Sequence, residues 1–273
     1  MTRRPDITAL ERLLHRDRAI TLAALLAAAA LAWAYLVGGA GMNGTPQAMA
    51  NMPGMSMSGM SMPGMAMTPT WTASYFAVMA AMWVIMMVAM MLPSAAPMVL
   101  LFATVERRRR AASPFPATAR FALAYALLWA AVGLLGALLQ WQFDRLALLT
   151  PAIAVTSTAA TGAALIAAGL YQFTPLKQAC LRGCRSPLEF ISQYWTRGPF
   201  GLGLTHGVYC VGCCWMLMLL LFVGGVMNLV WVAAIALFAL IEKVAPRGRL
   251  IAYAAGIALV VAGGWQLHAA MRL

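Results

Sequence analysis

The chain has 273 residues, of which 63% are hydrophobic and only 10% are charged, and its mean hydropathy is +0.81. Soluble globular domains carry about a quarter charged residues, so this composition excludes a soluble protein and predicts an integral membrane protein. The formal net charge of +12 would suit a nucleic-acid partner. That class is excluded because the basic residues alternate between loops instead of forming one patch.

Apolar runs of about 20 residues recur along the chain, and at 1.5 Å per residue each is long enough to cross about 30 Å of hydrocarbon. They predict an all-α fold, a polytopic transmembrane helix bundle of seven spans. The spans fall at about 19–38, 72–92, 119–140, 151–172, 202–222, 226–242 and 250–268. The chain then divides into a basic N-terminus (1–18), a first transmembrane helix (19–38), a flexible loop (39–71) and a six-helix transmembrane core (72–273).

The basic residues predict how the chain is oriented in the membrane. Seventeen of the nineteen Lys and Arg residues precede the first span or lie in alternate loops after it, and only Arg145 and Arg272 lie in the others. The positive-inside rule therefore predicts a cytoplasmic N-terminus and a periplasmic C-terminus in a bacterial inner membrane, with membrane lipid as a partner. The first span has a long basic leader and no clear cleavage site, so we expect an uncleaved helix rather than a signal peptide.

The loop at 39–71, predicted to be periplasmic, contains "NMPGMSMSGMSMPGMAM" at 51–67, three near-copies of a five-residue unit. Recurring glycine and proline remove helix and strand periodicity, so a flexible loop is expected. Exposed thioethers gain nothing from packing, and thioether sulfur is a soft ligand that selects Cu(I). The candidate ligands are Met52, Met55, Met57, Met60, Met62, Met65 and Met67. The alternative is a Met-rich linker without a ligand role.

The predicted second span continues the methionine pattern. At 100° per residue, Met79, Met82, Met86 and Met90 fall within about 80° of one another on one helix face, and Met87 and Met91 lie alongside. This ladder is a candidate Cu(I) path, and its spacing locally resembles the Met-x3-Met filter of the eukaryotic three-span copper channels. The alternative is ordinary helix packing by a flexible apolar side chain. The prolines of "LPSAAP" at 92–97 predict a kink or a break in the helix.

The predicted fifth span contains "THGVYCVGCCWMLM" at 205–218. His206, Cys210 and Cys213 follow the spacing i, i+4, i+7 and share one helix face, with Cys214 on the adjoining flank. A nitrogen and two thiolates suit Cu(I), or Zn(II) with a fourth donor supplied elsewhere. The alternative is that the cysteines and the histidine only pack in the core, but ionisable groups at membrane depth are functional by default.

Two further cysteines, Cys180 and Cys184, lie four residues apart in a predicted cytoplasmic loop, where one helical turn would put both on one face. Nearby Lys and Arg residues are expected to lower their thiol pKa, so the pair is a candidate inner metal site or thiol relay. Cysteines on the reducing cytoplasmic side and methionines on the oxidising periplasmic side are the division expected of a protein that handles a soft metal across the membrane. Glu242 and Lys243 are expected to form an interfacial ion pair near the cytosol; the alternative is that they support the metal site or the ion pathway.

Three motifs carry a family resemblance: "MMLPSAAPM" at 90–98, "GLTHGVYCVGCCWMLMLLLFVGGVMN" at 203–228 and "EK" at 242–243. Over about residues 75–270 the chain resembles a bacterial family of multi-span proteins labelled predicted metal-binding integral membrane proteins. The resemblance implies metal binding by the region around His206 and Cys210–Cys214. It names no transported species and does not cover the methionine repeat.

Two hypotheses follow. The favoured one is a protein that is not an enzyme and that captures, transfers or transports Cu(I), with a periplasmic copper chaperone or a copper enzyme under assembly as partner. The alternative is a membrane thiol-disulfide oxidoreductase that passes reducing equivalents through Cys210 and Cys213, with Cys180 and Cys184 as exchange partners.

Overall fold

The computed structural model describes residues 7–39, 71–109, 113–150 and 153–272. These residues form helices joined by short turns, and the only β contact among them is an isolated bridge between Leu149 and Val155. The predicted all-α class is confirmed. The methionine repeat at 51–67, and with it all seven candidate ligands of the loop, lies outside the described residues.

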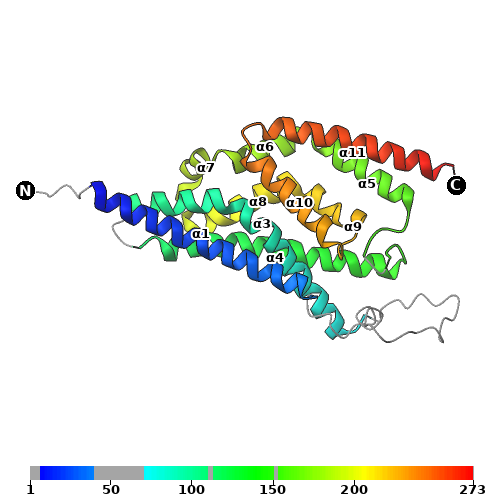
Figure 1. The fold of residues 1–273 in the computed structure, drawn as a ribbon, viewed down its shortest axis with the longest axis horizontal. Helices are drawn as coiled ribbons and strands as arrows, with labels where there is room; N and C mark the ends of the chain where they lie inside the picture. The colour runs from blue at the N-terminus through cyan, green and yellow to red at the C-terminus, as the bar shows by residue number, and fades with distance from the viewer. Residues whose placement is uncertain (1–6, 40–70, 110–112, 151–152, 273) are drawn as a thin grey trace, which may run out of the picture.

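The helices follow one another along the chain with few long connections (Figure 1). They are α1 (Ile7–Val37), α3 (Ala73–Arg109), α4 (Phe115–Arg145), α5 (Thr158–Tyr171), α6 (Pro175–Arg185), α7 (Pro187–Tyr194), the 3-10 turn η1 (Trp195–Arg197), α8 (Gly198–Leu219), α9 (Leu221–Gly224), α10 (Leu229–Val244) and α11 (Gly248–Ala270).

Five stretches of the described chain are long and apolar enough to cross a membrane: Glu11–Val37, Ala73–Arg109, Phe115–Arg145, Pro187–Gly224 and Gly248–Ala270. The protein is therefore a polytopic membrane protein. The other two predicted spans correspond to α5 and α10, which have 14 and 16 residues. At 1.5 Å per residue these helices are only about 21 and 24 Å long, so the count of seven spans stays a prediction.

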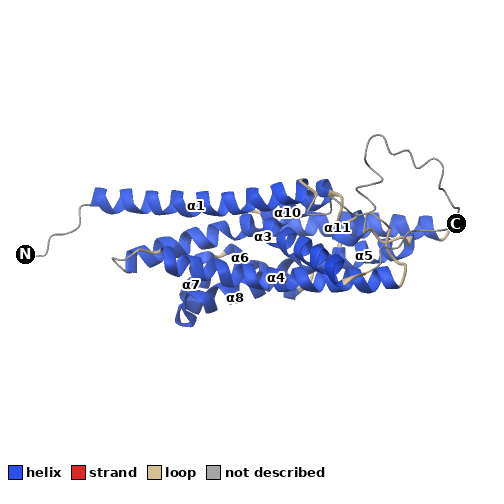
Figure 2. Cartoon of the chain, turned by 90° about the horizontal axis from the view of Figure 1, so that it is seen from below, coloured by secondary structure: helices blue, strands red, loops and turns tan. Residues whose placement is uncertain are grey.

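The long helices α1, α3 and α4 run beside one another, and α8 packs between α4 and α6. The α5 and α11 helices form a pair at one side of the bundle, and α10 connects this pair to α3 (Figure 1). Figure 2 shows α1 along the outside of the bundle. The start of α1 and the end of α11 lie at opposite ends of the molecule.

Close backbone approach at glycine holds two of these helix pairs together. A Cβ atom added at Gly203 of α8 would lie 2.2 Å from the carbonyl oxygen of Phe121 in α4, so no larger residue fits. Likewise, a Cβ at Gly169 of α5 would lie 2.7 Å from the carbonyl oxygen of Gly256 in α11. Helices in lipid associate through such close packing because lipid tails give no hydrophobic drive for pairing.

Helix α3 remains one helix of 37 residues through Pro93 and Pro97, and Figure 1 shows it bending along its length. The predicted interruption is therefore a bend and not a break. The carbonyl oxygen of Met91, just before the prolines, accepts hydrogen bonds from the Ser94 hydroxyl at 2.8 Å and the Tyr125 hydroxyl at 3.0 Å. The bond from Tyr125 fixes the backbone of Met91 relative to α4.

Basic segments that the sequence assigns to one side of the membrane meet at one end of the bundle. Arg107 at the end of α3 forms an ion pair with Asp17 of α1. The guanidinium of Arg109 lies 4.5 Å from the centroid of the Trp195 ring in η1. The first helix, the end of α3 and the turn before α8 are thus joined by charged groups, as the predicted sidedness requires. That this end faces the cytoplasm stays a prediction.

Candidate metal centre

Helix α8 carries three buried cysteines toward the middle of the bundle, in contact with α3, α4 and α10. The sulfur of Cys210 lies 2.9 Å from the Lys243 ammonium of α10 and 3.0 Å from the Tyr125 hydroxyl of α4. The thiols of Cys213 and Cys214 donate to the carbonyl oxygen of Cys210, at 3.1 and 2.9 Å. All five cysteines of the chain are free thiols.

A methionine of α3 completes this group. The Met91 sulfur lies 3.9 Å from the Cys214 sulfur and 4.0 Å from the Lys243 ammonium nitrogen. We refer to Cys184, Cys210, Cys213, Cys214 and Met91 as the sulfur cluster. The sequence favours Met82, Met86 and Met90 and places Met91 alongside them, and all four are buried in α3. Among the hydrogen-bonding contacts of the described residues, it is the Met91 sulfur that joins α3 to the α8 cysteines.

The α6 cysteines face α8. Cys184 lies near enough to Cys210 and Cys213 to interact with them electrostatically, so we count it in the sulfur cluster. Cys180 packs against Gly212, where an added Cβ would lie 2.6 Å from its sulfur. Helix α6 is not among the five candidate spans, and burial there raises the pKa of the Cys180 thiol, with the nearby Cys213 adding to the effect. The expected lowering of this pKa by basic neighbours is wrong, because desolvation outweighs them.

His206 lies one helical turn before Cys210 and is buried among aromatic rings. Its ring stacks on Tyr125 with centroids 5.5 Å apart, and Phe190 meets it edge-on at the same distance. Among the described residues its Nδ1 atom has no hydrogen-bond partner, which is uncommon for a buried polar atom. No group of three or more His, Cys, Asp or Glu side chains in the described part of the chain is arranged to hold a metal ion.

Glu242 and Lys243 do not pair with each other, so the expected interfacial ion pair is wrong. Consecutive residues of a helix point about 100° apart, and these two turn to different neighbours. Glu242 forms an ion pair with Lys177 of α6 at 2.8 Å, with both side chains at most 1% exposed. Lys243 donates to Cys210 and, at 3.0 Å, to the Ser94 hydroxyl. Glu242 therefore joins α10 to α6, and Lys243 joins α10 to α8 and α3 beside the sulfur cluster.

The positions of the sulfur atoms suit a soft metal ion. A zinc–thiolate bond is about 2.3 Å long, so one ion can bridge two sulfurs up to about 4.6 Å apart. The 3.9 Å between the Met91 and Cys214 sulfurs is within that limit. Thiol and thioether donors select Cu(I) over hard cations. The ammonium of Lys243 stabilises the thiolate form that a metal ligand requires.

A scan against protein families gives one match, to PpoB2, described as a copper chaperone, over residues 80–266. No curated protein and no solved structure matches the chain. The matched range includes all five residues of the sulfur cluster and Lys243, and it begins after the methionine repeat. The match confirms the expected link to copper, while the resemblance to the predicted metal-binding integral membrane proteins stays a prediction. Because the match spans more than half of the sequence, the chain belongs to the PpoB2 copper chaperone family.

Proposed function

We propose that this protein binds Cu(I) inside the bacterial inner membrane at the sulfur cluster and passes the ion to a partner, without acting as an enzyme. The observation that carries the proposal is the approach of Met91 to Cys214 at 3.9 Å. These residues lie 123 positions apart, on α3 and α8. Packing alone gives no reason for a thioether, a set of free thiols and an ammonium to meet at one point of an apolar core.

The charges around the cluster support a monovalent cargo. Lys243 is nearly fully buried and its ammonium contacts the Cys210 sulfur, so the pair of ammonium and thiolate is neutral overall. A buried charge is tolerated only when it is paired, and a divalent ion would add more charge than the described ligands balance. The soft donors and this charge balance both favour Cu(I) over Zn(II).

The remaining candidate ligands define a route for the ion. The seven methionines of the repeat would capture Cu(I) in the periplasm, and the α3 ladder of Met82, Met86 and Met90 would lie between the repeat and the sulfur cluster. Cys180 and Cys184 of α6 would accept the ion at the inner end. A periplasmic copper chaperone or a copper enzyme under assembly is the partner that this chemistry fits, because both exchange Cu(I) between sulfur ligands.

The test measures copper bound to the full chain, purified in detergent under reducing conditions from copper-replete cells. The seven repeat methionines are replaced by serine in every sample, so that copper on the loop does not mask the core. We expect Cys210→Ser combined with Cys214→Ser to remove the core copper. Met79→Leu, whose sulfur accepts from Gln140 at 3.7 Å, is the control and keeps it. Undiminished copper in a folded double variant would refute the proposal.

A thiol-disulfide oxidoreductase remains the second candidate, on one observation. Cys184 of α6 lies near Cys210 and Cys213 of α8, so the candidate exchange partners come from neighbouring helices. Exchange proceeds through a mixed disulfide, so a variant that keeps one cysteine of the pair would trap a partner protein. Trapping by Cys213 with Cys210 replaced would favour the oxidoreductase. Copper binding without any trapped partner would favour the chaperone.

A further inference from the structure

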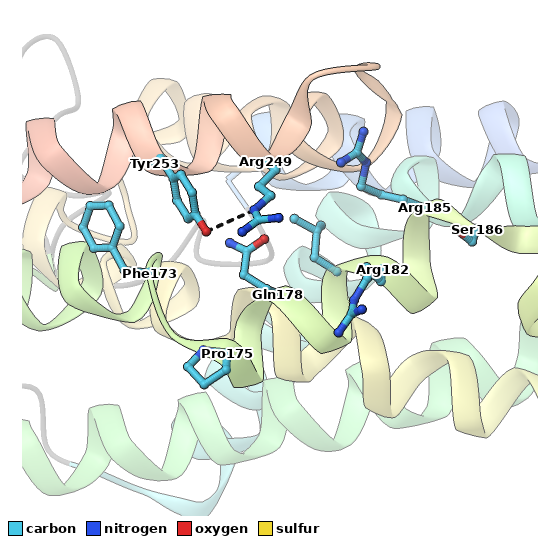
Figure 3. Close-up of a pocket in the computed structure, with 9 residues that line it drawn as sticks. Phe173, Pro175, Gln178, Arg182, Arg185, Ser186, Arg249 and Tyr253 are labelled. Carbon is cyan, nitrogen blue, oxygen red and sulfur yellow. Dashed lines mark hydrogen bonds between the residues drawn. The ribbon is translucent and has the colours of Figure 1, made fainter.

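A cavity of about 620 Å³ opens between α6 and the first turns of α11, and no residue of the sulfur cluster lines it (Figure 3). Its lining combines three arginines with polar and apolar side chains and contains no acidic residue. The lining residues are Phe173, Pro175, Gln178, Leu181, Arg182, Arg185, Ser186, Arg249 and Tyr253. The cavity is therefore a basic pocket with partly apolar walls.

Two arginines of this basic pocket, Arg185 and Arg249, are held in place by hydrogen bonds. One terminal nitrogen of Arg185 donates to the carbonyl oxygens of Ala245 and Pro246, at 2.8 and 2.7 Å. The Arg249 Nε atom donates to the Tyr253 hydroxyl at 3.1 Å. Figure 3 shows Arg249 beside Gln178 and Tyr253, with the other two arginines further along α6. Each guanidinium carries five N–H donors, so these bonds leave donors for a ligand.

The positive charge of the basic pocket exceeds the negative charge near it. In the described part of the chain, the Arg182 side chain has no hydrogen-bond or ion-pair partner, although it lines the cavity. The Glu242 carboxylate of the adjoining α10 helix interacts electrostatically with Arg185, but it is paired with Lys177 at 2.8 Å. Arginine side chains recognise phosphate oxygens through paired N–H donors. An anion with a phosphate group is therefore the ligand that this chemistry fits.

The surface next to the basic pocket indicates where the rest of the ligand lies. Along α11, which begins at the pocket, Leu250, Ile257 and Val261 are 61%, 59% and 67% exposed. On the α6 side, Leu176 beside the lining residue Pro175 is 60% exposed. A free phosphate ion would leave these apolar side chains uncovered, whereas acyl chains would cover them. Basic sites at the membrane surface bind anionic lipid headgroups in this way.

We propose that the basic pocket binds the phosphate of an anionic phospholipid, with the acyl chains along α11. The phosphate accepts hydrogen bonds from Arg182, Arg185 and Arg249. The pocket belongs to the loops that the charge pattern assigns to the cytoplasmic side, so the lipid comes from the inner leaflet. The bound lipid joins α6, which carries two of the cysteines, to α11. This proposal does not depend on copper binding.

The test follows lipid binding to the full chain in detergent by native mass spectrometry. The probes are phosphatidylglycerol, which is anionic, and phosphatidylcholine, which carries the same phosphate but no net charge. We expect wild-type protein to prefer phosphatidylglycerol. Arg182→Gln combined with Arg249→Gln should weaken its binding about thirtyfold, because each arginine near an anionic surface contributes about fivefold.

The control combines Arg145→Gln with Arg272→Gln, which removes the same charge at residues that do not line the pocket. This pair should leave lipid affinity unchanged, and both pairs should keep wild-type copper content. Equal losses of lipid affinity in the two double variants would overturn the proposal, because they would show a general effect of net charge. The absence of any loss in the Arg182 and Arg249 variant would overturn it as well. Displacement of the lipid by millimolar inorganic phosphate would also overturn it, in favour of a soluble phosphate ligand.

Discussion

Replacing Met91 by leucine removes the α3 sulfur from the cluster and changes little else. Leucine has nearly the same volume, so we expect the free energy of unfolding to fall by less than about 1.5 kcal/mol. The thioether lies 3.9 Å from the Cys214 sulfur, within reach of a shared ion. Loss of a residue that only supports a metal ligand already lowers metal affinity about 10–100-fold, so loss of a ligand should cost at least as much.

The matched control is Met90→Leu. Met90 is the preceding residue of the same helix, is equally buried and belongs to the ladder that the sequence favours. We expect Met91→Leu to weaken Cu(I) binding at least tenfold and Met90→Leu to leave it within about threefold. The assay titrates Cu(I) in the presence of a competing chelator, with the repeat methionines replaced by serine. The reverse order of the two effects, or equal effects, would refute the assignment of Met91 as a ligand.

Three further predictions concern packing, charge and thiol reactivity. Gly203→Ala should destabilise the protein by about 1–3 kcal/mol, measured by thermal unfolding in detergent, because its Cβ would lie 2.2 Å from the Phe121 carbonyl oxygen. Lys177→Met should cost about 3–5 kcal/mol in the same assay, because it leaves the buried Glu242 carboxylate unpaired. Because burial raises the pKa of the Cys180 thiol above its ordinary value of 9.0, maleimide should react with it more slowly at pH 7.5 than with a cysteine peptide.

Each of these predictions has its own control. Gly264→Ala, where an added Cβ meets no atom within 4 Å, should leave the unfolding temperature unchanged. Adding Glu242→Leu to Lys177→Met should restore most of the lost stability, because the unpaired charge is then gone. The maleimide rate at Cys180, measured with the other four cysteines replaced, should continue to rise above pH 9. A rate that levels off below pH 8 would contradict a raised pKa.

The fold class was predictable because an apolar run long enough to cross the lipid can be recognised directly in the sequence. The helices α1, α3, α4, α8 and α11 each meet the length and apolarity of a span within the candidate stretches. Hydropathy alone did not show that α5 and α10 are short, because loops and helix ends beside a membrane are apolar as well. Their ends depend on local capping, such as the Ser157 side chain accepting from the Ala160 amide at α5.

The α8 half of the sulfur cluster was predictable, and the other half was not. Helical periodicity alone puts Cys210 and Cys214 on neighbouring flanks of one helix. That Met91 and not Met90 meets them depends on the rotation of α3 after its bend, which arises from tertiary contacts. The inclusion of Cys184 depends on the docking of α6 against α8, and the sequence signal for that docking was the glycine at position 212. The direction of Lys243 required the structure, since its neighbour Glu242 points to another helix.

The position of the Lys243 ammonium bears on how the proposed cargo ion would be loaded. It lies 2.9 Å from the Cys210 sulfur, where an ion bound to that sulfur would meet a second positive charge. Two like charges about 4 Å apart repel by about 4 kcal/mol at an effective dielectric constant of 20. Under the proposed function, loading would therefore be an exchange of cations and not a simple addition, with the lysine displaced as the metal arrives. Its return would favour release of the metal with no change of oxidation state, so one side chain would provide both the resting counterion and a means of unloading.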